Sequence, residues 1–310
     1  MEIRRIGNNA AGIWSHMRSN PSLYLLLVPG LIYYVVFHYV PMYGVTIAFK
    51  QYNIFGGMFK SDWVGFKHFI ELFSNDNFYK VLRNSLLISL YKIVFNFPAP
   101  IILAILLNEV RKMSFKRTIQ TVIYLPYFLS WVVIAGLVIN FLSPSTGVVN
   151  MVIESMGGEP INFLANKAYF RTIIVLSDLW HGMGWNTIIF LAALTGIDPQ
   201  LYEAARMDGA SRLRQIVHVT LPGIKSTIVV LLLIKIGHMM DNGFEQIFLL
   251  SNPLVYEVGD VFETYVYRTG LVETRYDFST AVGLFKSLVG LVLLLIANSL
   301  ARKSGERGIF

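Results

Sequence analysis

The sequence contains no cysteine and few charged residues. Of its 310 residues, 15% are charged and 55% are hydrophobic, whereas about a quarter of the residues in a soluble protein are charged. The lack of cysteine excludes disulfide bonds, thiolate metal sites and a cysteine nucleophile. A chain this apolar is expected to lie in a lipid bilayer, where a helix of about 20 apolar residues crosses the hydrocarbon core.

The phosphate-binding loop of many ATPases is also missing. Its pattern of Gly, four residues and Gly-Lys-Ser/Thr occurs nowhere in the chain, and this loop cradles the phosphates of ATP. We therefore expect no ATP or magnesium site in this polypeptide. His181 and His238 have no partner at the spacing that metal ligands need, so we expect no metal site either.

Six stretches are long and apolar enough to cross a membrane. They span residues 22–42, 82–107, 119–141, 170–195, 225–250 and 279–300. The sequence predicts an all-α polytopic protein: an N-terminal segment 1–21, a six-helix transmembrane domain 22–300 and a tail 301–310. Prolines inside several stretches predict kinked helices arranged around a cavity.

The distribution of basic residues predicts the orientation of the chain. Fourteen of the 26 Lys and Arg residues lie in the two ends and in the loops 108–118 and 196–225, against nine in the segments 43–83, 142–171 and 251–278. Because basic loops stay on the cytoplasmic side, both termini are predicted to be cytoplasmic. The net charge of +7 is then a topological signal, and it does not indicate nucleic-acid binding.

The loop 196–225 contains a polar, basic run of twenty residues, EAARMDGASRLRQIVHVTLP, from Glu203 to Pro222. Asp198-Pro199 predicts a helix start, and Asp208-Gly209 predicts a turn. Ser211 is expected to cap a second helix that ends at Leu221-Pro222. Such an ordered segment outside the lipid indicates a docking site for another protein.

This run resembles the EAA motif of ABC-importer permeases, the loop that grips the ATPase subunit. The motif residues in register are Glu203, Ala204, Ala205, Gly209, Leu221 and Pro222, while Val219 stands where the family has Ile. The segments Gly243–Leu250 and Ser251–Leu271, with Trp63-Val64-Gly65 and Phe69, look like the branch of carbohydrate permeases that imports complex oligosaccharides such as pectin or alginate fragments. The resemblance covers nearly the whole chain after its first twenty residues.

The resemblance implies a type I importer permease fold in the bacterial cytoplasmic (inner) membrane. The chain would be one transport subunit, not an enzyme, and would work with a second homologous permease and two ATPase subunits that bind ATP and magnesium. An extracytoplasmic solute-binding protein would dock on loops 43–83 and 251–278. The implied ATPase-coupling residues are Glu203, Ala204, Ala205, Arg206, Asp208, Gly209, Ala210, Arg212 and Arg214.

Polar side chains inside the apolar stretches are candidates for a substrate pathway, because ionisable groups at membrane depth are costly unless they face protein or water. If 225–250 is one helix, Lys235, His238, Asn242, Glu245 and Gln246 fall on one face at about 100° per residue. Sugars present hydroxyls beside apolar faces, which suits hydrogen-bonding groups next to aromatic rings. The candidates are Tyr127, Trp131, Asn140, Asp178, Trp180, His181, Trp185, Asn186, His238, Asp241, Asn242, Glu245 and Gln246.

Two alternatives remain open from the sequence. The polar groups could hydrogen-bond between helices or to the second permease without touching substrate. Asp241 and Glu245, four residues apart, could also serve a proton relay in a stand-alone carrier or channel. The loop 196–225 discriminates between the two kinds of transporter, since a proton-driven carrier has no use for an ATPase-docking segment.

Overall fold

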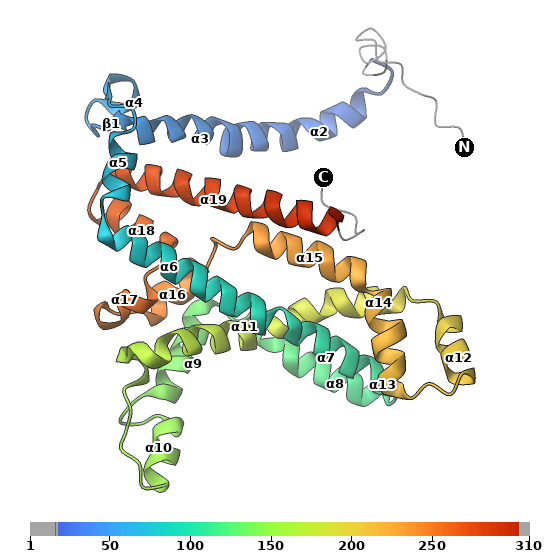
Figure 1. Ribbon diagram of the computed structural model, residues 1–310. Helices are drawn as coiled ribbons and strands as arrows, with labels where there is room; N and C mark the ends of the chain where they lie inside the picture. The colour runs from blue at the N-terminus through green and yellow to red at the C-terminus, as the bar shows by residue number, and fades with distance from the viewer. Residues whose placement is uncertain (1–15, 17, 304–310) are drawn as a thin grey trace. The chain divides into compact units, whose positions relative to one another are not determined.

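The computed structural model describes residue 16 and residues 18–303, which are helical almost throughout (Figure 1). The chain divides into two compact units, one up to Lys67 and one from His68. The expected N-terminal segment 1–21 and tail 301–310 lie mostly outside the described residues.

The first unit is one long apolar helix followed by a small hairpin. Helix α2 (Pro21–Tyr34) continues through a π-helical turn (Val35–Tyr39), α3 (Val40–Met42) and a 3-10 helix (Tyr43–Phe49). Strand β1 (Lys50–Gln51) then pairs antiparallel with β2 (Asp62–Trp63), and α4 (Gly57–Lys60) lies between them. Helix α2 buries none of its residues, which fits an apolar helix surrounded by lipid or by another subunit.

The second unit opens with α5 (Lys67–Phe73) and a helix of 34 residues. This long helix consists of α6 (Asp76–Tyr91), a π-helical turn η3 (Lys92–Asn96) and α7 (Pro98–Glu109). Proline has no N–H to donate to the preceding turn, and the π turn ends at Asn96, two residues before Pro98. The widened turn places Lys92 and Asn96 in the interior, where both are buried.

The stretch 119–141, expected to be one span, forms two helices. Helix α8 (Met113–Tyr124) and the 3-10 turn η4 (Leu125–Phe128) meet α9 (Trp131–Leu142) at 101°. Pro126 lies in the 3-10 turn and Ser130 caps α9, so the local sequence accounts for the bend. Helix α10 (Val148–Ser155) and a 3-10 turn (Phe163–Ala165) follow.

Helix α11 (Lys167–Thr195) packs against α7, η3 and η4. It leads to α12 (Pro199–Met207), which Asp198 caps by accepting from the N–H of Gln200, as predicted. The next helical run comprises α13 (Arg212–Gln215), η6 (Ile216–Thr220) and α14 (Leu221–Gly223). The Ser211 side chain lies at the N-cap position but makes no capping hydrogen bond, so that part of the prediction is wrong. The helical run ends at Gly223, one residue after the predicted end at Leu221-Pro222, and the chain then bends by 60° into α15 (Lys225–Gly237).

The stretch 225–250 is also two helices, so the predicted continuous polar face is wrong. Helix α15 (Lys225–Gly237) stops before a non-helical segment, and α16 (Phe244–Leu250) starts after it. Gly243, at φ 88°, supplies the left-handed conformation that this break requires. The chain ends with a 3-10 turn (Pro253–Val255), α17 (Tyr256–Gly259), α18 (Phe262–Tyr267), a π turn η8 (Arg268–Val272) and α19 (Tyr276–Lys303).

The count of six spans is not confirmed. Among the described residues, three helices are long and apolar enough to cross a membrane: Pro21–Phe49, Asp76–Glu109 and Tyr276–Lys303. The count rises to five if each bent pair, Met113–Phe128 with Trp131–Leu142 and Arg212–Gly223 with Lys225–Gly237, makes one span. Helix α11, at 29 residues, is long enough at about 43 Å but more polar.

The helices α6–α7 and α19 run along the second unit from one end to the other. In Figure 1, α12 lies at one end, toward which α19 also runs, and α10 and α17 lie at the other. The loop 196–225 and the C-terminal end of α19 are therefore on the opposite side of this unit from the segments 142–171 and 251–278.

We predict that Gly184→Ala destabilises the protein. A Cβ on Gly184 of α11 would lie 1.9 Å from the carbonyl oxygen of Ile123 on α8, so the helices would have to separate, at a cost of about 1–3 kcal/mol or more. Gly136→Ala in α9 is the matched control, because a Cβ there meets nothing within 4 Å. Thermal unfolding of the purified protein measures both; equal midpoints would contradict the packing described.

Candidate functional site

A buried lysine stands at the centre of the second unit. Lys92, 5% exposed, places its Nζ 3.1 Å from an Asp178 carboxylate oxygen on α11. The same ammonium donates to the carbonyl of Asn242 at 2.9 Å and to the Gln246 side chain at 2.8 Å. Asn96 donates to the other Asp178 oxygen at 2.7 Å. An ammonium and a carboxylate are thus both paired and hydrogen-bonded, as buried charges must be.

The network also fixes the break between α15 and α16. Gln246 donates to the carbonyl of Ile174 at 2.7 Å and to the Ser177 hydroxyl at 2.8 Å. Ser89 donates to the Asn242 side-chain oxygen at 2.9 Å and also to the carbonyl of Met239. The helices α6–α7 and α11 and the non-helical segment 238–243 are therefore joined by polar contacts within an apolar surrounding.

An aromatic cluster lies one to two helical turns away from Asp178 along α11, at His181 and Trp185. Trp185 stacks on Tyr127 with ring centroids 4.6 Å apart and an interplanar angle of 2°. His181 lies against Trp131 at 4.4 Å, and Phe128 meets Trp185 edge-on at 6.1 Å. Trp185 is 40% and Tyr127 38% exposed, so the cluster presents flat ring faces and polar edges at a surface.

A cavity of about 260 Å³ opens on the adjacent face of α11. Asp178, Gly182 and Asn186 line it from α11, and Lys235 and His238 line it from the end of α15. Asn96 and apolar side chains of α7, α11 and α15 form the rest of the wall. Trp185 and Asn186 are consecutive in sequence, so the aromatic cluster and this cavity lie side by side on one helix.

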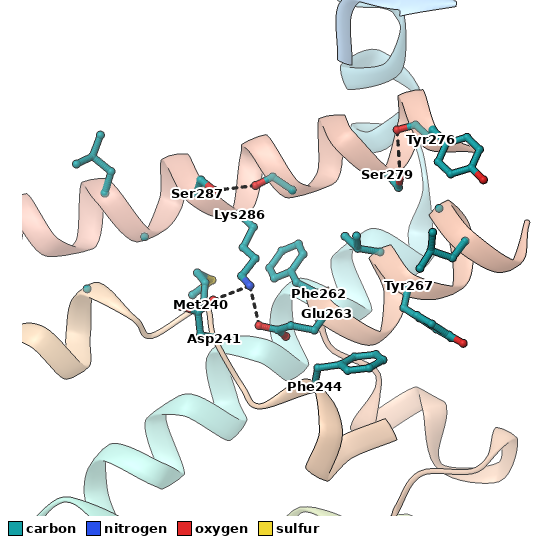
Figure 2. Close-up of a pocket in the computed structure, with 17 residues that line it drawn as sticks. Met240, Asp241, Phe244, Phe262, Glu263, Tyr267, Tyr276, Ser279, Lys286 and Ser287 are labelled. Carbon is teal, nitrogen blue, oxygen red and sulfur yellow. Dashed lines mark hydrogen bonds and ion pairs between the residues drawn. The ribbon is translucent and has the colours of Figure 1, made fainter. Parts of the chain in front are cut away.

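A larger cavity, of about 750 Å³, lies between α15, α16, α18 and α19. Figure 2 shows Lys286 of α19 extending between Asp241 and Glu263, at 2.6 and 2.7 Å. His238 in turn contacts Asp241 at 2.9 Å. Every charged side chain that lines this cavity is therefore held by an ion pair.

The far end of the second unit carries two further ion pairs. Lys167 pairs with Glu257, and Arg268 pairs with Asp260. The hydrogen bond from the Lys167 ammonium holds the pKa of Glu257 below its usual value. The first pair joins α17 to α11, and the second joins the residue after α17 to the π turn η8, so both shape the segment 251–278.

The loop 196–225 has a defined backbone. Gly209 has φ +73°, its N–H donates to the carbonyl of Arg206, and the N–H of Ala210 donates to that of Ala205. This pair of bonds is the Schellman motif, which needs a left-handed residue after the helix end. Gln215 donates to the carbonyl of Ala210 at 2.9 Å, and the Tyr202 hydroxyl contacts that of Thr220 at 3.0 Å. The turn is thereby held in one shape.

Large apolar side chains cover the outside of this loop. Met207 is 88% and Leu213 72% exposed, and both flank the turn at Gly209. Glu203, Arg206, Arg212 and Arg214 are exposed around them. Exposed apolar groups ringed by charge are typical of a protein-binding surface. Sequence reasoning named the charged and small residues of the motif but missed Met207 and Leu213.

The structure gathers most of the predicted pathway residues but not all. Tyr127, Trp131, His181 and Trp185 form the aromatic cluster, Asp178, Asn186 and His238 line the smaller cavity, and Asp241 lines the larger one. Asn242 and Gln246 are buried in the Lys92 network. The three that lie exposed outside these groups are Asn140, Trp180 and Glu245.

Sequence reasoning missed Lys92, Lys286 and Glu263. A signal was present for the two lysines, because each lies well inside an apolar stretch, and such residues mark functional or structural sites. Glu263 lay in a segment expected to be a loop, where a carboxylate is unremarkable.

The sequence of residues 96–306 matches the family described as the binding-protein-dependent transport system inner membrane component. The match covers more than half of the chain. The chain belongs to this family. Its members are permease subunits of ABC transporters, in which a separate subunit hydrolyses ATP, so membership favours an ATP-driven importer over a proton-coupled carrier or channel.

Individual relatives cover almost the whole permease. It is 51% identical over 288 residues to the polygalacturonan/rhamnogalacturonan transport system permease protein YteP of Bacillus subtilis (strain 168), spanning 93% of this chain and 90% of that protein. It is 30% identical to the arabinooligosaccharides transport system permease protein AraP of the same organism, over 90% of this chain and 88% of that one. A solved bacterial alginate ABC transporter, in complex with an alginate pentasaccharide-bound periplasmic protein, has a chain with TM-score 0.89 and 42% identity; the match covers 96% of the permease and 99% of that chain.

We predict that Lys92→Met destabilises the permease by about 3 kcal/mol, because it leaves the Asp178 carboxylate without its ammonium partner. The double variant Lys92→Met with Asp178→Asn should recover part of that loss, since it removes both charges. Thermal unfolding of the purified complex measures each variant. If the loss of stability in the double variant equals the sum of the losses in the two single variants, the two side chains act independently and the pairing argument is wrong.

Proposed function

We propose that this permease forms half of the translocation pathway of an ABC importer for acidic oligosaccharides. It works in the bacterial cytoplasmic membrane with a second homologous permease, two ATPase subunits and an extracytoplasmic solute-binding protein. Both termini are cytoplasmic. The names of YteP and of the alginate transporter support uronate-containing sugars as the substrate class.

The observation that carries this proposal is the loop at one end of the second unit. A Schellman turn at Gly209 presents Met207 and Leu213 to the outside beside the EAA residues Glu203, Ala204 and Ala205. This protruding turn can bind in a groove on an ATPase subunit, because the apolar side chains contribute affinity and the surrounding charges orient the two proteins. Nothing within 4 Å would meet a Cβ on Gly209, so the partner's backbone has room to approach.

The connection from this loop to the pathway is short. Helix α12 follows directly after α11, whose residues line the smaller cavity and the aromatic cluster. On the other side, the run Arg212–Gly223 bends by 60° into α15, which carries Lys235. A displacement of the loop by the ATPases therefore moves both walls of the cavity, and ATP binding opens it outward while hydrolysis resets it.

The aromatic cluster and the cavity beside it suit a sugar. Tyr127 and Trp185 offer stacking faces, and Asn186 and His238 offer hydrogen-bonding groups. Modest contacts of this kind favour release as well as binding, and transport needs only a difference in affinity between the two conformations. The solute-binding protein docks on loops 43–83 and 251–278; the second of these lies at the end of its unit opposite α12 (Figure 1).

We predict that Gly209→Asp uncouples the importer. An aspartate fills the space that the ATPase backbone needs and disfavours the left-handed turn, by about 1 kcal/mol or more, so ATPase stimulation by loaded binding protein should fall at least tenfold. ATP hydrolysis and oligosaccharide uptake are measured in vesicles that hold the complete complex.

The matched control is Gly157→Asp. Gly157 also has a positive φ, +82°, with nothing within 4 Å of its Cβ position, but it follows α10 at the opposite end of the second unit. Its variant should keep near-normal stimulation. Full stimulation in the Gly209→Asp complex, or an equal loss in both variants, would contradict the coupling role of the turn.

A further inference from the structure

Lys235 differs from Lys92 and Lys286, which also lie well inside apolar stretches. Lys92 makes three polar contacts, and Lys286 is held by two carboxylates. Lys235 is exposed, and no hydrogen bond or ion pair holds it in the part of the chain that the structure describes. A charged lysine inside a membrane is energetically costly unless it has a partner. Lys235 is therefore a candidate to bind an anionic ligand.

The surroundings of Lys235 form a built cavity. It lines the space of about 260 Å³ together with Asn186, His238 and Gly182. The Asn186 amide is likewise exposed and makes no hydrogen bond to any described residue, so two unoccupied donors share one cavity. A Cβ on Gly182 would come no closer than 3.4 Å to anything, and that contact is the Asn186 amide nitrogen. The floor of the cavity is therefore open rather than filled.

The charges around this cavity do not cancel. Lys235 acts electrostatically on both Lys92 and Asp178, but the Asp178 carboxylate is already taken by Lys92 and Asn96. The other nearby carboxylate, Asp241, is held by His238 and Lys286. The Lys235 ammonium therefore has no carboxylate of its own, and the cavity carries an excess positive charge that can make a charge-assisted hydrogen bond to an anionic ligand.

We propose that Lys235 binds the carboxylate of a uronate residue, with Asn186 bonding a neighbouring oxygen of the same sugar. This inference deepens the proposed function by naming the residue that distinguishes acidic from neutral sugars. The cavity is slightly smaller than a typical small-molecule site of about 300–1,000 Å³, which suits one ring of a longer chain. Trp185 is next to Asn186 on α11, so its ring face can stack on the adjoining sugar of the same oligosaccharide.

The experiment compares two probes that differ at one position of each sugar, which carries a carboxylate in one probe and a neutral hydroxymethyl group in the other. A labelled oligogalacturonate and its carboxyl-reduced, neutral counterpart are bound to the purified complex of both permeases and both ATPases without the binding protein. Any discrimination then arises in the membrane subunits. The wild-type complex should bind the acidic probe about tenfold more tightly, a difference of about 1.4 kcal/mol. Lys235→Met should lose that preference with little change for the neutral probe.

The conservative variant Lys235→Arg is the matched control, since it keeps the positive charge and should retain the preference. Thermal unfolding of all three complexes checks folding, which Lys235→Met should leave unchanged because no described residue loses a contact. The proposal is overturned if Lys235→Met weakens both probes equally or neither, or if sulfate displaces the acidic probe as well as galacturonate does. If the wild-type complex binds neither probe, the proposed substrate class itself fails.

Discussion

The buried contact between Lys92 and Asp178 is the constraint on which the second unit depends. An unpaired charge inside an apolar body would cost several kcal/mol, so the chain must bring a carboxylate and further acceptors to Lys92. Those partners come from α11 and from the segment that separates α15 from α16. Once they are in place, the polypeptide cannot run as one straight helix through residues 225–250, because the carbonyl of Asn242 must face the ammonium.

This arrangement explains why the polar residues divide into groups with different roles. Asn242 and Gln246 satisfy Lys92 and are buried. Asp241 turns to Lys286 on the other side of the same break. Lys235 and Asn186 remain facing the smaller cavity, beside the aromatic cluster. The structural groups hold the helices at a fixed spacing, whereas Lys235 and Asn186 are the groups that we propose contact the solute.

Much of the molecule could be predicted from its sequence. The apolar stretches predict most of the long helices, and Asp198 predicts the start of α12. Asp208-Gly209 predicts a turn, and Gly209 has the left-handed conformation there. The breaks could not be found from periodicity, because an angle of 100° per residue assumes an unbroken helix. The contact of Lys92 with Asp178 joins residues 86 apart, and its contact with Asn242 joins residues 150 apart. No local pattern encodes which distant carboxylate or carbonyl meets a given lysine.

The central claim is that force generated by separate ATPase subunits reaches the pathway through the loop 196–225. The most direct measurement is uptake of labelled oligogalacturonate into vesicles that contain either this permease alone or the full complex with binding protein and ATP. The account predicts no uptake by the permease alone and uptake by the complex that stops when the ATPases cannot hydrolyse ATP. Uptake by the isolated permease, without nucleotide, would contradict it.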